Sequence, residues 1–266
     1  MSGPTLGGVV HSVRSLLTAP AFDLVAPSED SVPFDAASGR GIPRVADVYL
    51  PAGPGPHPSV VLVHGGGWVI GSRRMKPMRY LAGLLVARGF AVAVGEYRMV
   101  FRGGRIAEAV DDVVAMLRWW IGRGSELHLD PDRVAAVGLS AGATTLLLAA
   151  EQVPLSQVVS VFGVYDFASM RGGLGGLIAP LLLQGEAERW SPLRRSLPTN
   201  RLTLLHGTAD TLTPIEDARR AAKDWAAAGV TVELIEYEGL PHAFFNDATS
   251  PGCQRATADL LRVLGG

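Results

Sequence analysis

The segment 138–142 constrains the fold of this chain more than any other. It reads Gly-Leu-Ser-Ala-Gly, a G-x-S-x-G pattern, with the apolar strand-like run 134–137 before it and the helix-like run 143–150 after it. A serine on a sharp turn between a strand and a helix presents its hydroxyl to a base and a substrate. The flanking glycines suit such a turn, because a side chain would clash where the backbone doubles back. The sequence therefore predicts a strand–turn–helix unit with Ser140 at the turn.

Strand-like and helix-like patterns alternate from about residue 45 onward. Strands are expected at 45–50, 59–63, 90–94, 134–137, 158–162, 202–205 and 232–237, and helices at 78–88, 106–122, 143–150, 214–228 and 254–264. We expect Thr213 to cap the helix that Pro214 opens. This alternation predicts an α/β fold, with a mostly parallel central sheet and helices on both faces.

Residues 165–198 interrupt the alternation. They hold no clear strand pattern, and a glycine-rich stretch there passes into a strongly apolar run. This segment could be a helix packed on the body or a small lid over a site, and its length favours the lid. We predict a single domain over 45–266 with a lid-like insertion at 165–198. It follows an N-terminal arm and first-strand region over 1–44, in which 1–20 form a short helix or a loose arm.

Charge and composition exclude several classes of partner. The chain has 24 basic and 25 acidic residues and a net charge of -1, so no nucleic acid partner is expected. Cys253 is the single cysteine, which leaves no internal disulfide. Two long uncharged stretches, 48–72 and 134–150, are broken by proline and glycine or too short, so no membrane span is expected. His11 and Arg14 interrupt what would be the apolar region of a signal peptide, which predicts a cytoplasmic protein, with a homodimer as the candidate assembly.

Two loops supply partners for Ser140. Asp210 follows one predicted strand and His242 follows the last, and loops after parallel strands gather at one edge of a sheet. Cleavage of an ester or amide by serine needs a base for the hydroxyl proton and a carboxylate that orients the base. We therefore predict Ser140 as nucleophile, His242 as general base and acid, and Asp210 as the orienting group. Glu216 and Asp217 are weaker candidates, because acids in the first turn of a helix serve its dipole.

A second motif, His-Gly-Gly-Gly-Trp at 64–68, directly follows a predicted strand. Consecutive glycines let backbone N–H groups converge where negative charge develops, and the amide of Ala141 adds a donor beside Ser140. His64 and His206 are expected to brace their loops. A zinc site built from these two and His242 lacks a close ligand pair, so no metal is predicted.

Together these motifs resemble those of α/β-hydrolase carboxylesterases of the hormone-sensitive-lipase-like group, with their compact bacterial esterase and kynurenine-formamidase-like relatives. Four landmarks match in order, at 64–68, 138–142, 206–210 and 242–244. The resemblance implies the α/β-hydrolase fold, and an oxyanion hole formed by the amides of Gly66, Gly67 and Ala141. Glu96 stands where that family often has aspartate, and we expect the change to alter a structural contact. The large N-terminal helical cap of many such esterases is not evident.

The expected function is hydrolysis of small-molecule carboxylic esters with short to medium acyl chains, through an acyl-enzyme and with no cofactor. Trp68, Tyr165 and Phe244 are candidate substrate-binding residues, although aromatic side chains at such positions are as often core. One alternative is the same machinery acting on an amide, as an arylformamidase or acyl-peptide hydrolase. Others are a C–C bond hydrolase or lyase, and a non-catalytic protein that binds a ligand under its lid. All three triad residues are present, which favours an enzyme.

Overall fold

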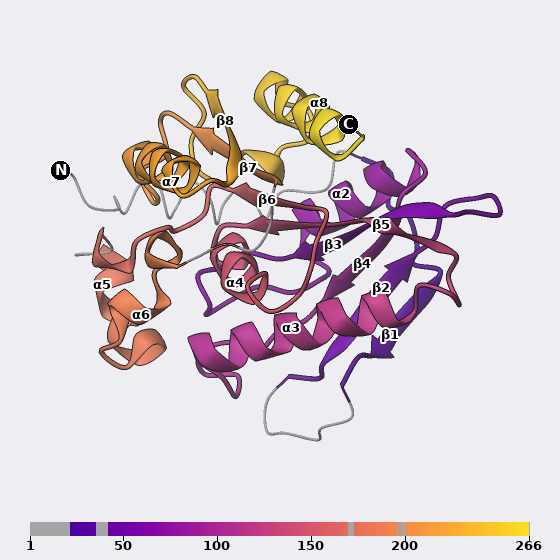
Figure 1. Ribbon diagram of the computed structural model, residues 1–266, viewed down its shortest axis with the longest axis horizontal. Helices are drawn as coiled ribbons and strands as arrows, with labels where there is room; N and C mark the ends of the chain where they lie inside the picture. The colour runs from indigo at the N-terminus through magenta and orange to yellow at the C-terminus, as the bar shows by residue number, and fades with distance from the viewer. Residues whose placement is uncertain (1–21, 36–41, 170–172, 196, 198–200, 266) are drawn as a thin grey trace.

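The centre of the molecule is a twisted sheet. The computed structural model describes residues 22–35, 42–169, 173–195, 197 and 201–265, and these form an eight-stranded sheet in the order β1-β2-β4-β3-β5-β6-β7-β8 (Figure 1). The strands are β1 (Glu29–Pro33), β2 (Val45–Tyr49), β3 (His57–Val63), β4 (Ala91–Gly95), β5 (Leu129–Leu139), β6 (Gln157–Val161), β7 (Arg201–Gly207) and β8 (Thr231–Tyr237). β2 pairs antiparallel with β1 and β4, and the other neighbours pair in parallel. The predicted mostly parallel sheet is confirmed.

Helices cover both faces of this sheet, as predicted (Figure 1). One face carries α3 (Ile106–Gly122), α4 (Ala141–Ala149) and α7 (Ile215–Ala227), and the other carries α2 (Lys76–Val86) and α8 (Pro251–Gly265). Strand β3 shows why its sequence is almost continuously apolar. Val61 and Val63 belong to the first hydrophobic cluster, while Val60 and Leu62 belong to the second, because successive side chains point to opposite faces.

The helices lie where the sequence patterns predict them, with shifted boundaries; α2 and α4 each begin two residues earlier than expected. Helix α8 begins before the expected residue 254, because the Ser250 hydroxyl accepts a hydrogen bond from the Cys253 amide at 3.1 Å and caps the first turn. The expected cap by Thr213 is wrong. Helix α7 begins at Ile215 with Pro214 at its N-cap and no side-chain cap, since the Thr213 hydroxyl donates instead to the buried carboxylate of Asp210.

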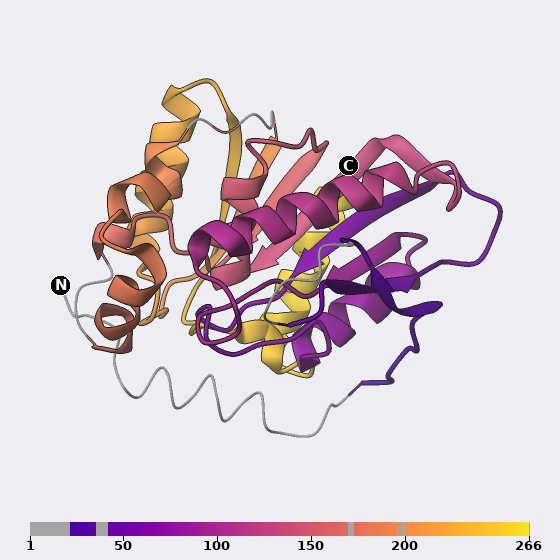
Figure 2. The ribbon, with the colours of Figure 1, turned by 90° about the horizontal axis from the view of Figure 1, so that it is seen from below.

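The segment 165–198 is helical where the structure describes it. It contains α5 (Gly173–Leu183) and α6 (Ala187–Trp190), flanked by the 3-10 turns η1 (Phe167–Ser169) and η2 (Pro192–Arg194). Figures 1 and 2 show α5 and α6 together beside α7, at one end of the molecule.

The N-terminal region enters the sheet through β1, at its edge. The short helix or arm expected over 1–20 lies outside the described residues. Within the described part of the chain, none of the helices combines the length and the apolar character needed to cross a membrane.

Candidate functional site

Ser140 lies on a strained turn between β5 and α4. Its backbone has φ +53° and ψ -121°, and φ in this range is unfavourable for a residue with a side chain. A Cβ added to Gly138 would lie 2.5 Å from the Cα of Ala143, and one added to Gly142 would lie 2.3 Å from the carbonyl oxygen of His64. Only glycine fits these two positions, because the turn presses α4 against the end of β3.

The three residues predicted to act together meet at this turn. The Nε2 atom of His242 is 3.0 Å from the Ser140 hydroxyl, and its Nδ1 atom is 2.7 Å from Oδ2 of Asp210. Because Nδ1 faces a carboxylate, it carries the proton and donates a hydrogen bond there, which leaves Nε2 to accept the hydrogen bond from Ser140. They come from the loops after β5, β7 and β8, so the parallel strand order brings them to one edge.

Asp210 is held as an ionised carboxylate. Its Oδ1 accepts hydrogen bonds from the amides of Leu212 and Thr213, each at 2.9 Å, and its Oδ2 accepts one from the Thr213 hydroxyl at 2.8 Å. Burial alone would raise the pKa of Asp210, but the electrostatic interaction and hydrogen bond with the Nδ1–H of His242, with smaller contributions from His206 and the Thr213 amide, hold that pKa below its usual value. Sequence reasoning missed Thr213 here, since a threonine before Pro214 also fits a helix cap.

His206 braces the loop that carries Asp210, as expected. Its Nε2 faces the carbonyl oxygen of Thr213 at 2.7 Å and therefore carries a proton. The ring is fully buried, and this burial lowers the pKa of His206 despite the Asp210 carboxylate 3.5 Å away. A neutral His206 fixes the 207–213 loop by hydrogen bonding rather than by charge.

The glycine loop after β3 adopts a backbone that side chains would prevent. Gly66 has φ +121°, and a Cβ there would lie 1.8 Å from the Ile70 carbonyl oxygen. Gly67 has φ +61°, and an added Cβ would meet nothing within 4 Å, so this residue borders open space. Ala141 is the first residue of α4, and an α-helix does not use the amide of its first residue. The Ala141 amide is therefore available to an anion beside Ser140.

The three aromatic candidates lie in the hydrophobic core. Trp68 is 1% exposed, and its indole N–H donates to the hydroxyl of Thr145 in α4 at 2.9 Å. Tyr165 is fully buried, and Phe244 packs edge-on against Phe162 with ring centroids 4.9 Å apart. Trp68 thus ties the glycine loop to the helix that follows Ser140. Substrate contact by these three residues stays a prediction.

His64 lies between β3 and the glycine loop and is fixed on several sides. Its Nδ1 donates to the Gly65 carbonyl oxygen at 2.8 Å, and its ring stacks on that of Tyr97 with centroids 4.3 Å apart. The Tyr97 hydroxyl donates to the His64 carbonyl oxygen at 2.9 Å, and Glu96 lies 3.5 Å from His64 Nε2. Glu96 therefore does take part in a structural contact. Among the described residues, no group of three or more His, Cys, Asp or Glu side chains is arranged to hold a metal ion.

Comparison with known proteins relates this site to esterases. A BD-FAE family model matches residues 46–153. An isoprenylcysteine alpha-carbonyl methylesterase of Arabidopsis thaliana is 29% identical over 255 residues, covering 82% of this chain and 58% of that protein. An ethyl acetate hydrolase of Pseudomonas putida is 26% identical over 212 residues, covering 70% and 65% respectively. The chain therefore spans a little over half of the length of the methylesterase it matches.

A solved structure shares the fold. The apo form of esterase 2 from Thermogutta terrifontis superposes with a TM-score of 0.74 at 25% identity, covering 91% of this chain and 96% of that one. The predicted fold class is confirmed by this agreement.

Proposed function

We propose that this chain, an α/β-hydrolase that resembles serine esterases, hydrolyses carboxylic esters of small molecules. One observation carries the proposal: a continuous hydrogen-bonded path from the Ser140 hydroxyl through His242 to Asp210, with steps of 3.0 and 2.7 Å. Such a path lets a neutral hydroxyl act as a nucleophile at neutral pH.

In the first half of the reaction, Ser140 Oγ attacks the acyl carbon while its proton passes to His242 Nε2. The carbonyl oxygen becomes an oxyanion, which the amides of Gly66, Gly67 and Ala141 stabilise. The bond to the alcohol oxygen then breaks, and the alcohol leaves with the proton from His242. Asp210 holds the ring in position and stabilises its positive charge throughout.

In the second half, water takes the place of the alcohol. His242 removes a proton from the water, which attacks the acyl carbon of the acyl-enzyme, and the same amides hold the second oxyanion. Collapse of this intermediate returns the proton to Ser140 and releases the carboxylic acid. No step requires a metal ion or an organic cofactor.

The relatives favour an ester over an amide as the substrate. Both curated relatives described above are named for carboxylic ester cleavage, one for a methyl ester and one for ethyl acetate. The apolar helix α5, where Leu181 is half exposed, supports a substrate with a short to medium acyl chain and a lid role for 165–198.

A single domain over 45–266, a cytoplasmic location and a homodimer stay predictions. Light scattering of the purified protein tests the homodimer.

Steady-state hydrolysis of p-nitrophenyl esters from acetate to decanoate tests the proposal, with the butyryl p-nitroanilide as the matched amide. We expect kcat/KM to peak at a short or medium chain and to exceed that for the anilide. Faster cleavage of the anilide would assign the site to amides. Absence of turnover on every ester and amide would favour the ligand-binding alternative.

A further inference from the structure

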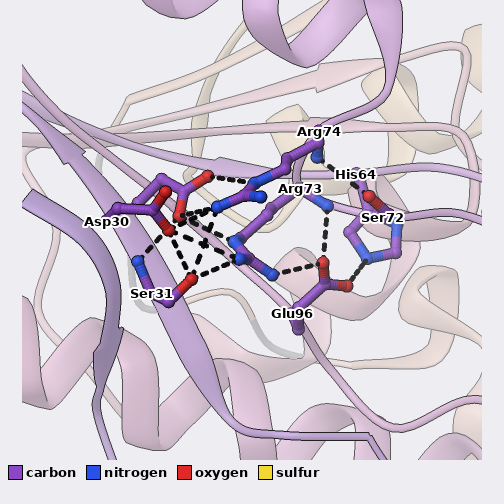
Figure 3. A network of polar contacts seen from close by, with 8 residues as sticks. Asp30, Ser31, His64, Ser72, Arg73, Arg74 and Glu96 are labelled. Atoms are coloured by element: carbon purple, nitrogen blue, oxygen red, sulfur yellow. Dashed lines mark hydrogen bonds and ion pairs between the residues drawn. The ribbon is translucent and has the colours of Figure 1, made fainter. Parts of the chain in front are cut away.

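One carboxylate joins the two ends of the glycine loop 65–72 (Figure 3). Glu96 follows β4, and its Oε1 accepts hydrogen bonds from the backbone amide of Arg73 at 3.1 Å and from its guanidinium Nη1 at 3.0 Å. Its Oε2 lies 3.5 Å from Nε2 of His64. His64 directly precedes the loop and Arg73 directly follows it, so Glu96 links the two ends of the loop. We call the cluster of Glu96, His64 and Arg73 the clasp.

The Arg73 side of this clasp is itself anchored. The Arg73 guanidinium donates from Nε to Asp47 of β2 at 2.8 Å and from Nη2 to the Ser31 hydroxyl of β1 at 2.8 Å. Figure 3 shows Ser31 meeting Arg73 on the side away from Glu96. Asp47 is almost fully buried, and its strand is held in the sheet by β4. His64 directly follows β3 and Arg73 is bonded to β1 and β2, so the loop is fixed to the sheet at both of its ends.

Charge is part of this arrangement. Glu96 is buried, and burial alone would raise its pKa, but His64 and Arg73 outweigh that effect and hold the pKa of Glu96 below its usual value. Glu96 is therefore ionised at neutral pH. Arg73 supplies both of the hydrogen bonds described for this carboxylate, so losing Arg73 would leave most of the buried charge uncompensated.

The loop between these ends cannot hold its own shape by regular structure. Gly66, Gly67 and Gly71 all have positive φ, at +121°, +61° and +128°. Glycine at such positions permits the conformation but loses the most entropy when it is fixed. Turn hydrogen bonds to the Gly66 carbonyl oxygen, from the amides of Val69 and Ile70 at 3.2 and 3.1 Å, hold the middle of the loop. The direction of the Gly66 and Gly67 amides relative to the sheet therefore also depends on the contacts made at the ends of the loop.

We propose that Glu96 and Arg73 are positioning residues, which hold the glycine loop so that its amides point at the oxyanion. This inference rests on the proposed function. Donors aimed at a developing charge act only when they are fixed in place before the reaction, and a displacement of about 1 Å can cost roughly a hundredfold in rate. Neither residue needs to touch the substrate for this role.

The test compares Glu96→Ala, Glu96→Gln and Arg73→Ala with the parent on the best ester of the series. We expect kcat to fall about 10- to 100-fold in Glu96→Ala and Arg73→Ala, with KM changed by less than about threefold, because the lost interaction acts in the transition state. Glu96→Asp, which keeps the charge on a shorter side chain, should recover part of the loss. The affinity for a boronic acid transition-state analogue should fall by the same factor as kcat/KM.

Arg74→Ala is the matched control. Arg74 belongs to the same network through Asp47 and Asp30, but its side chain is half exposed and it is not part of the clasp. We expect kcat for Arg74→Ala to stay within about twofold of the parent. The double variant of Glu96→Ala and Arg73→Ala should be little slower than the worse single variant, because both act through one loop.

A purely structural role would lower the melting temperature of the Glu96 variants and leave kcat and analogue affinity of the folded protein unchanged, which would overturn the inference. Glu96→Gln keeps the volume of the side chain and serves if Glu96→Ala does not fold.

Hydrogen exchange of the peptide covering 65–72 separates this inference from the proposed function. If the parent cleaves no ester, the proposed function fails, while faster exchange in Glu96→Ala but not in Arg74→Ala still supports the clasp, and unchanged exchange overturns it.

Discussion

Thr213 donates two hydrogen bonds to Asp210, one from its amide to Oδ1 at 2.9 Å and one from its hydroxyl to Oδ2 at 2.8 Å. Oδ2 is also the oxygen that faces Nδ1 of His242 at 2.7 Å. One residue therefore sets the plane of the carboxylate that orients the proposed base.

Removal of the Thr213 hydroxyl should slow the enzyme. In Thr213→Val the carboxylate loses one charge-assisted hydrogen bond, which is worth roughly 1.5–3 kcal/mol, so we expect kcat/KM to fall about 10- to 100-fold. Thr213→Ser keeps the donor and should stay within about threefold of the parent. Steady-state kinetics of both variants would measure this, and equal rates for valine and serine would show that the hydroxyl is not used.

Stability should decline in acid because the structure holds several carboxyl groups ionised. Burial alone would raise the pKa of Asp47, but hydrogen bonds from Arg74 and Arg73 hold that pKa below its usual value, and the pKa values of Glu96 and Asp210 are lowered as well. The stabilisation from these groups is complete at a pH above their pKa values in the unfolded state, which are roughly 4. It is lost as the pH falls from there through their lower pKa values in the folded state.

Asp47→Asn isolates one of these groups. At pH 7 we expect the free energy of unfolding to drop by about 2–3 kcal/mol, since the Arg73 side chain is 12% exposed but that of Arg74 is half exposed. The difference from the parent should shrink as the pH falls below about 4, where the unfolded parent binds a proton at Asp47 that the folded parent does not. Urea unfolding at pH 7 and pH 3.5 measures both values, and a difference that is equal at the two pH values would contradict this origin.

Two glycine-to-alanine changes should have opposite effects. A Cβ at Gly142 would meet the carbonyl oxygens of His64 and Val63 at 2.3 and 2.4 Å, so α4 must move away from the glycine loop. We expect a loss of about 1–3 kcal/mol in stability and of more than about a hundredfold in kcat. Gly122, the last residue of α3, has open space around its Cβ position, and Gly122→Ala should be neutral or stabilising by up to about 1 kcal/mol. Thermal unfolding and kinetics of the pair decide this, and an active, stable Gly142→Ala would refute the packing argument.

The sequence predicted those parts of the fold that depend on local patterns. Helix α3 spans the expected 106–122, because its apolar residues repeat at helical spacing along one side. Ser140, Asp210 and His242 could be placed together because each follows a predicted parallel strand, and such loops meet at one edge.

Contacts between distant segments were not predictable in this way. The clasp and its anchors join Ser31, Asp47, Arg73 and Glu96, which come from four separate stretches of chain with no shared periodicity. The misassigned Thr213 shows a second limit. In the local motif the Thr213 hydroxyl would accept a hydrogen bond from a backbone N–H at the helix start. In the folded chain it instead donates a stronger one to the ionised carboxylate of Asp210.

Pre-steady-state hydrolysis of a p-nitrophenyl ester by the parent and by Ser140→Ala tests the central claim most directly. The account predicts that kcat falls at least about 10³-fold in the variant, and that any burst of nitrophenol in the parent approaches one equivalent and disappears in Ser140→Ala. Rates in Ser140→Ala equal to those of the parent would contradict it, because the hydroxyl held by His242 would then not be the nucleophile.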